Sequence, residues 1–134
     1  MKEIYTTKMV NTGGRNGESV ADDRSFQVKI APPGSNVADA TNPEQLFAAG
    51  YSACFNSALD LVKRQKGIKG KSTISVTVRL FEKAAADFIL AVEIVGHIDD
   101  VSREEALELL HMTHQVCPYS KATAGNIDVE IKAV

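Results

Sequence analysis

A chain of 134 residues can bury one hydrophobic core but is too short for two domains of ordinary size, so we expect a single domain over residues 1–134. Its net charge of −2 and scattered basic residues argue against both nucleic acid and a membrane surface as partners. No apolar stretch has the length of a signal peptide or of a membrane span of roughly 20 residues. The expected location is therefore cytoplasmic.

The first part of the chain predicts strands separated by loops. Residues 2–10 and 18–31 alternate in a way typical of strands, with a turn inside the second segment. Between them, residues 12–17 contain three glycines, which predicts a tight loop presenting one charged side chain, Arg15. A second loop, rich in proline and glycine, is expected over residues 31–36 and leads towards a long helix.

That central helix is predicted over residues 43–66. Asn42 suits the N-cap, Pro43 suits the first helical position, and Gly67 supplies a C-terminal stop. The middle of the helix is apolar nearly all round, which indicates burial on several sides. Because so small a domain has little interior, we expect a homodimer whose interface uses this helix.

The second half of the chain predicts a hairpin, a helix and a final strand. Residues 72–82 and 87–97 alternate apolar and polar side chains and are joined by a short connection. Ser102 and Glu105 form a capping-box pattern for a second helix, and a last strand is expected over residues 127–132. This order predicts an α+β fold, with antiparallel sheets packed on a long buried central helix and a second helix.

The two cysteines are too few for a secreted disulfide scaffold, and such a pair in a reducing compartment is often catalytic, metal-binding or simply buried. Cys54 lies midway along the central helix, and Cys117 lies at the end of the second. A thiol peroxidase needs a thiolate to attack the peroxide, and burial raises the pKa of a thiol. A cation must therefore lie beside it. Arg15 is a candidate, although loop arginines are commonly just solvated.

Residues 12–17, 41–55, 116–123 and 125–127, in this order and spacing, resemble the signature blocks of the organic hydroperoxide resistance (Ohr) family. The resemblance runs nearly end to end. The position of Arg15 and the Cys-Pro-Tyr-Ser block favour this branch over the sibling osmotically inducible (OsmC) branch. An OsmC-type hydroperoxide reductase is the alternative within the same family.

The resemblance implies an OsmC/Ohr-like fold, an intertwined homodimer, and a peroxidase that reduces alkyl and fatty-acid hydroperoxides to alcohols. It implies that Cys54 is the peroxidatic cysteine, that Cys117 resolves it as a disulfide, and that Arg15 and Glu44 form the activating pair. It implies no bound cofactor. The disulfide is expected to be reduced by an external dithiol, such as the dihydrolipoyl group of a lipoylated protein.

Helix geometry raises a question about Glu44. Ten residues of continuous helix separate Glu44 from Cys54 by about 15 Å and by about 80° around the axis, so one Arg15 could hardly bridge both. Either the helix breaks near Gly50, or Glu44 reaches the site from the partner subunit. We favour the partner subunit.

Two further patterns on the predicted helices leave alternatives open. Phe47, Tyr51 and Phe55 recur every four residues near Cys54, and this stripe either lines an apolar substrate pocket or packs the core.

His111, His114 and Cys117 recur every three residues on the second helix. Together with Cys54 they have the residue types of a structural zinc site, which would make the chain a non-enzymatic zinc-binding protein. Histidines near a helix C-terminus more often serve the helix dipole or lie on the surface, and no Cys-x-x-Cys pair supports a metal. We therefore expect no metal site.

Overall fold

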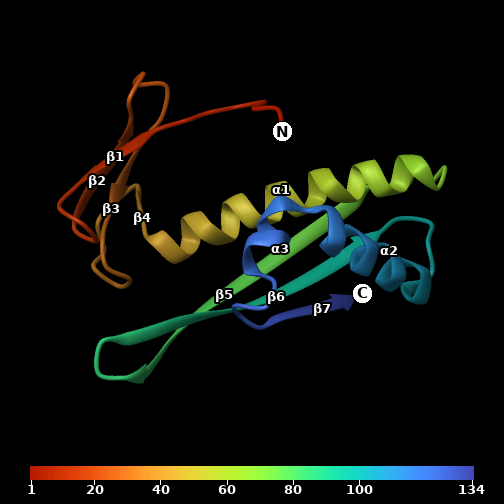
Figure 1. Cartoon of the computed structure of the whole chain (residues 1–134). Coiled ribbons are helices and arrows are strands. Elements are labelled where there is room, and N and C mark those ends of the chain that lie inside the picture. The colour runs from red at the N-terminus through yellow and green to blue at the C-terminus, as the bar shows by residue number, and fades with distance from the viewer. The chain divides into compact units, whose positions relative to one another are not determined.

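Two groups of elements, Met1–Leu46 and Phe47–Val134, make up the computed structural model, which describes all residues from 1 to 134 (Figure 1). Three helices and two separate sheets give the mixed α+β class that the sequence predicts. None of the three helices has the length and apolar character needed to cross a bilayer. The expectation of a single domain over residues 1–134 stays a prediction.

The first unit contains a four-stranded sheet of order β1-β2-β3-β4. β1 and β2 pair antiparallel, as do β2 and β3, whereas β3 and β4 run parallel. The strands are β1 (Met9–Thr12), β2 (Gly17–Ala21), β3 (Gln27–Ile30) and β4 (Ala40–Thr41).

The strand predicted over residues 2–10 is wrong over most of its length. Pairing begins only where Met9 lies opposite Ala21, and residues 1–8 form no strand. The strand predicted over residues 18–31 is in fact two strands, because the expected turn separates β2 from β3 completely. Alternation of apolar and polar side chains does not show which residues have a neighbouring strand to pair with. This explains both the missing strand over residues 1–8 and the division of residues 18–31 into two strands.

Helix α1 (Pro43–Gln65) closely matches its prediction. The side-chain oxygen of Asn42 accepts a hydrogen bond of 2.8 Å from the backbone N–H of Gln45, which caps the first turn. Gly67 follows the last turn with φ of +69°, a left-handed conformation that glycine adopts without strain. The helix runs without interruption through Gly50.

The second unit has a three-stranded sheet whose order is β5 (Ser72–Ala84), β6 (Asp87–Ile98) and β7 (Val129–Ala133). β5 and β6 form the predicted antiparallel hairpin, but β6 and β7 are parallel. The predicted antiparallel sheets therefore also contain two parallel strand pairs, β3–β4 and β6–β7. A parallel pair needs a long crossover, and here α2 (Arg103–Val116) and α3 (Pro118–Thr123) provide it.

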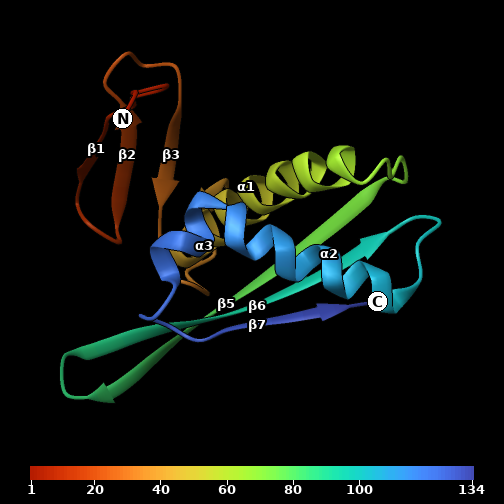
Figure 2. The same ribbon diagram turned by 45° about the vertical axis from the view of Figure 1, so that its right-hand side comes forward.

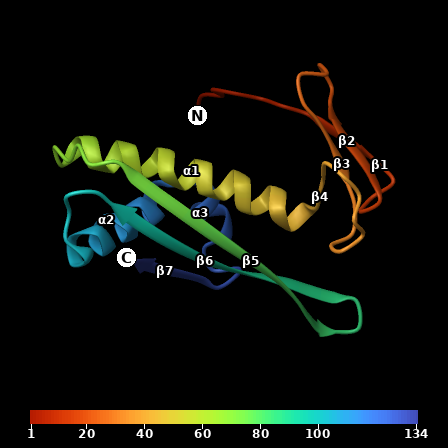
Figure 3. The ribbon, with the colours of Figure 1, turned by 180° about the vertical axis from the view of Figure 1, so that it is seen from behind.

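The helices of the second unit lie against one face of its sheet (Figures 2 and 3). Ser102 caps α2, because its hydroxyl accepts a hydrogen bond of 3.1 Å from the N–H of Glu105, as the sequence predicts. The short helix α3 was not expected. The core between helices and sheet is formed by side chains of α1, β6 and α2, among them Phe55, Leu59, Val62, Ile94, Ile98, Leu109 and Leu110.

The apolar middle of α1 is buried on one side only within a single chain. Phe55 and Leu59 have no exposed surface, whereas Ala49, Ala53 and Leu61 are exposed. Leu61 keeps 47% of its surface exposed. Burial on several sides, as the sequence predicts, would require a partner.

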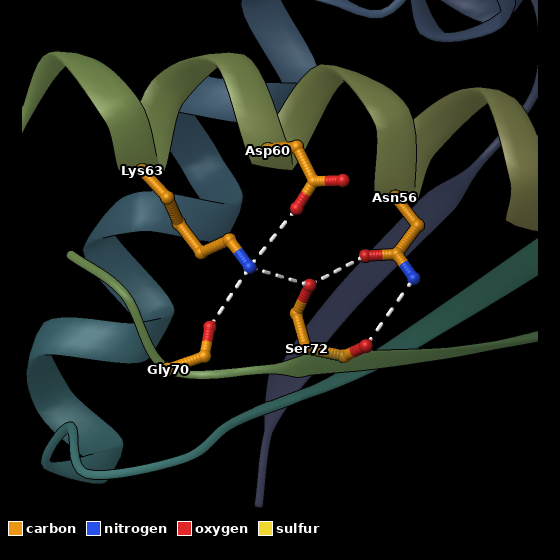
Figure 4. Close-up of polar contacts among 5 residues, drawn as sticks. All are labelled: Asn56, Asp60, Lys63, Gly70 and Ser72. Carbon is orange, nitrogen blue, oxygen red and sulfur yellow. Dashed lines mark hydrogen bonds and ion pairs between the residues drawn. The ribbon is translucent and has the colours of Figure 1, made fainter.

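A buried lysine ties the C-terminal half of α1 to the start of β5 (Figure 4). Lys63 is 6% exposed, and its ammonium group donates to the carbonyl of Gly70 (2.9 Å) and the hydroxyl of Ser72 (3.0 Å). It also pairs with Asp60 at 3.0 Å. Ser72 in turn donates to the side-chain oxygen of Asn56 at 2.7 Å. All three ammonium protons have acceptors, which compensates the burial of the charge.

Candidate active site

The two cysteines, 63 residues apart in the sequence, face each other in the second unit. Their sulfur atoms are 3.6 Å apart, and both thiols are free. Cys54 lies on α1 and is partly exposed, while Cys117 has no exposed surface. One thiol is therefore open to solvent and the other is held directly behind it.

Cys117 occupies the junction between α2 and α3. It is the C-cap of the first helix and the N-cap of the second, with φ of −60° and ψ of 123°. Its N–H donates to the carbonyl of Thr113 at 2.9 Å, and its own carbonyl accepts from the N–H of Lys121 at 3.0 Å. Pro118 has no N–H and suits the first position of α3. The chain is thus bent at Cys117 and anchored on both sides of it.

The surroundings of Cys54 within the second unit disfavour its thiolate. Burial raises the pKa of this thiol, the backbone N–H of Tyr119 lowers it in part, and the neighbouring thiol of Cys117 raises it further. A positive charge beside Cys54 would therefore be needed to make it a strong nucleophile at neutral pH.

A surface depression of about 430 Å³ reaches Cys54. Much of its lining is aliphatic, and charged side chains lie along α1. The lining residues are Cys54, Ser57, Ala58, Asp60, Leu61 and Arg64 of α1, together with Val116 and Pro118. A small apolar oxidant can therefore approach the sulfur from solvent.

The aromatic stripe on α1 belongs mainly to the core. Tyr51 and Phe55 have no exposed surface, and neither lines the depression at Cys54. Phe47 is partly buried and meets Tyr51 edge to face, with ring centroids 5.8 Å apart. Packing thus accounts for Tyr51 and Phe55, and substrate contact by the stripe stays a prediction, with Phe47 the member that keeps exposed surface.

Arg15 and Glu44 form a bidentate ion pair in the first unit. The two guanidinium nitrogens of Arg15 donate to the two carboxylate oxygens of Glu44, at 2.8 and 2.5 Å. This pairing lowers the pKa of Glu44 and raises that of Arg15, chiefly through the hydrogen bonds. At neutral pH the pair therefore keeps both charges.

The loop that carries Arg15 owes its shape to glycine and to one asparagine. Gly13 and Gly14 have φ of +87° and +61°, which favours glycine. The side chain of Asn11 accepts from the N–H of Gly14 at 2.9 Å and donates to the carbonyls of Gly14 and Glu18. The loop is thus closed on itself, and it presents Arg15 as its one charged side chain, as the sequence predicts.

The structure brings the four predicted catalytic residues together as two pairs, one in each unit. Cys54 meets Cys117, and Arg15 meets Glu44. The expected action of Arg15 on Cys54 stays a prediction, as does the subunit from which Glu44 acts.

The zinc alternative is not supported. No group of three or more His, Cys, Asp or Glu side chains is placed to hold a metal ion. The Nδ1 atom of His114 instead lies 2.7 Å from the hydroxyl of Ser120, and burial, with a smaller effect of His111, lowers the pKa of His114.

Sequence reasoning missed a set of buried hydroxyl groups in the two segments that carry the cysteines. The Tyr51 hydroxyl lies 2.9 Å from that of Ser120 and 3.2 Å from that of Thr123. A tyrosine, a serine and a threonine carry no signal of such a cluster in the sequence. Tyr51 lies three residues before Cys54, and Ser120 lies three residues after Cys117. The sequence does not show that these two residues are in contact.

Comparison with known proteins assigns this arrangement to a family. The model of the OsmC-like protein family matches residues 34–132, and the chain belongs to that family. Its α+β fold is the fold of solved OsmC and Ohr structures.

Among its relatives, the organic hydroperoxide resistance protein-like 1 of Staphylococcus saprophyticus is 47% identical over 131 residues, which cover 95% of this chain and 93% of that protein. An organic hydroperoxide resistance protein of Elizabethkingia anophelis has a solved structure with 43% identity and a TM-score of 0.90, covering 99% of this chain and 98% of that one. The solved structure of the organic hydroperoxide resistance protein OhrB of Bacillus subtilis has 41% identity and a TM-score of 0.88, covering 97% of this chain and 98% of that one. The predicted resemblance to the Ohr family is confirmed.

Proposed function

We propose that the chain is a two-cysteine peroxidase that reduces organic hydroperoxides to alcohols. The observation that carries this proposal is the pair of free thiols 3.6 Å apart, one reached by a surface depression and the other fully buried. A dithiol so placed can take up two oxidising equivalents by forming a disulfide, so that neither sulfur is carried on to a sulfinic or sulfonic acid.

In the first step, the Cys54 thiolate attacks the distal oxygen of the hydroperoxide. A sulfur–oxygen bond forms, the peroxide bond breaks, and the alkoxide leaves and takes a proton to become the alcohol. Cys54 is then a sulfenic acid. In the second step, the sulfur of Cys117 attacks that of Cys54, a disulfide forms, and hydroxide leaves with the proton of Cys117 as water. An external dithiol, such as a dihydrolipoyl group, then reduces the disulfide by exchange.

Arg15 and Glu44 act on the first step in this proposal. Burial raises the pKa of Cys54, and the guanidinium of Arg15 is the cation that would lower it and bind the peroxide oxygens. A carboxylate touching the thiolate would do the opposite, so Glu44 serves by holding two donors of Arg15 in place. That role agrees with the bidentate geometry of the pair.

The functional form in this proposal is a homodimer. A dimer would cover the exposed apolar side chains of α1, of which Leu61 is the largest. α1 is continuous through Gly50, so the alternative of a broken helix is wrong. Continuity favours delivery of the Arg15–Glu44 pair to Cys54 from the partner subunit. Sedimentation analysis measures the dimer, and mixed dimers of Glu44→Ala and Cys54→Ser chains measure the delivery.

Titration of the reduced protein with cumene hydroperoxide tests the peroxidase proposal directly. We expect the wild type to lose both thiols per peroxide, the Cys54→Ser variant to lose none, and the Cys117→Ser variant to over-oxidise at Cys54. Survival of both wild-type thiols in a modest excess of peroxide would rule out the mechanism. Dihydrolipoamide and a monothiol, compared as reductants of the oxidised protein, then test the choice of reductant.

A further inference from the structure

A cluster of buried hydroxyl groups joins the two chain segments that carry the cysteines. Tyr51 precedes Cys54 by three residues on α1, and Ser120 follows Cys117 by three residues at the start of α3. Tyr51 and Ser120 are joined at 2.9 Å, and the two sulfurs are 3.6 Å apart. Tyr51 and Cys54, three residues apart on α1, occupy neighbouring positions of one helix face. The hydrogen bond and the sulfur contact therefore connect the same two segments of the chain.

A second link closes the bend at Cys117. His114 lies three residues before Cys117, on the last turn of α2, and its Nδ1 atom is 2.7 Å from the hydroxyl of Ser120. This bond spans the junction of α2 and α3. Ser120 thus holds the bend from both directions, through His114 to α2 and through Tyr51 to α1.

Proton positions in this cluster follow from counting donors. The Thr123 hydroxyl donates to the carbonyl of Ser120 at 3.0 Å, so in its contact with Tyr51 the tyrosine must donate. Tyr51 then has no second proton, and Ser120 must donate to it. Ser120 in turn accepts from His114, whose proton lies on Nδ1. This single arrangement satisfies all four contacts.

The cluster is shielded from water, so its hydrogen bonds do not compete with bonds to solvent. Tyr51 and Ser120 have no exposed surface, and Thr123 is 5% exposed. Water cannot replace a hydrogen bond lost at such a site without entering the core. Only His114 lies near the surface, beside a depression formed with residues 124–129.

We propose that Tyr51, Ser120 and His114 are positioning residues for the second step of the reaction. They hold the bend between α2 and α3 so that Cys117 stays against Cys54 and captures its sulfenic acid before a second hydroperoxide arrives. That competing reaction transfers another oxygen to Cys54, gives a sulfinic acid and a second alcohol, and is irreversible for most proteins. None of the three residues is joined to either sulfur by a hydrogen bond. The inference rests on the proposed peroxidase function.

The test measures the fraction of Cys54 sulfenic acid that becomes disulfide and the fraction that becomes sulfinic acid. Wild type, Tyr51→Phe, Ser120→Ala and His114→Ala are treated with increasing cumene hydroperoxide at a temperature where each is fully folded, and the products are counted by intact-protein mass spectrometry. We expect disulfide formation to slow by about tenfold in the variants, because a small displacement of reacting groups has a large effect on rate. The sulfinic fraction at a given excess of peroxide then rises, while the rate of the first step changes little.

Matched variants separate positioning from a general loss of stability. His114→Asn keeps a side-chain N–H near the place of Nδ1 and should restore the wild-type ratio of disulfide to sulfinic acid. Tyr5→Phe removes an exposed hydroxyl outside the cluster and should not alter that ratio. If Tyr51→Phe does not fold, the His114→Ala and His114→Asn pair decides the question. An unchanged ratio in the folded cluster variants overturns the inference. A wild-type Cys54 that does not react with peroxide overturns the proposed function instead.

Discussion

Arg15 and Glu44 are joined by two parallel hydrogen bonds, although one belongs to a glycine loop and the other to the first turn of α1. The pairing fixes the plane of the guanidinium group, because a fork of two donors meets a fork of two acceptors. A lysine offers the same charge without that plane. The pair therefore provides an orientation as well as a charge.

Replacement of Arg15 by lysine is expected to slow the oxidation of Cys54 by about tenfold, because a preorganised pair of donors is exchanged for a single mobile ammonium. Stopped-flow measurement of the first turnover with cumene hydroperoxide gives the rate. Arg24→Lys, at an exposed arginine in a turn of the same unit, is the matched control. Equal rates for Arg15→Lys and the wild type would show that orientation is unimportant.

The pKa of Glu44, lowered by Arg15, predicts how the pair responds to acid. A carboxyl group whose folded pKa is depressed adds stability that is present above its unfolded pKa of about 4.3 and is lost as the pH falls through the folded pKa. The difference in denaturant midpoint between wild type and Glu44→Gln should be constant near neutral pH. It should shrink below about pH 4. A difference that persists undiminished in acid would mean that the charge of Glu44 contributes nothing.

Without Arg15, the thiol of Cys54 is expected to titrate above the ordinary cysteine value of about 8.5, because burial then acts unopposed by a cation. The rate of iodoacetamide alkylation against pH, measured in the Cys117→Ser background, reports this one thiol. We expect a lower apparent pKa for the variant that retains Arg15 than for the one with Arg15→Met. Identical profiles would argue that another group activates Cys54.

Loss of the buried Lys63 ammonium is expected to destabilise the fold by about 2 kcal/mol, because Lys63→Met leaves the Gly70 carbonyl and the Ser72 hydroxyl without their donor. Equilibrium unfolding in urea measures the change in free energy. Lys66→Met, an exposed site just past the end of α1, should change stability little. Equal effects of the two substitutions would show that the contacts of Lys63 are replaceable.

Local signals in the sequence were sufficient for most elements of this fold. The cap at Asn42 and the stop at Gly67 located α1, and Ser102 located α2, because capping depends on a few neighbouring residues. Alternation likewise located the hairpin of β5 and β6. Pairing with distant segments was not predicted correctly. Residues 1–8 form no strand, β4 was not expected, and the final strand β7 was expected but its parallel pairing with β6 was not.

The sequence by itself determined the family, the central helix and the two candidate catalytic cysteines, Cys54 and Cys117. Only the tertiary structure decided that the sulfur atoms of Cys54 and Cys117 lie 3.6 Å apart and that the hydroxyls of Tyr51 and Ser120 lie 2.9 Å apart. The tertiary structure also decided helix α3, because a helix of six residues is not stable alone and forms only where other elements pack against it. Such contacts join residues more than 60 positions apart, and no local preference of the chain records them.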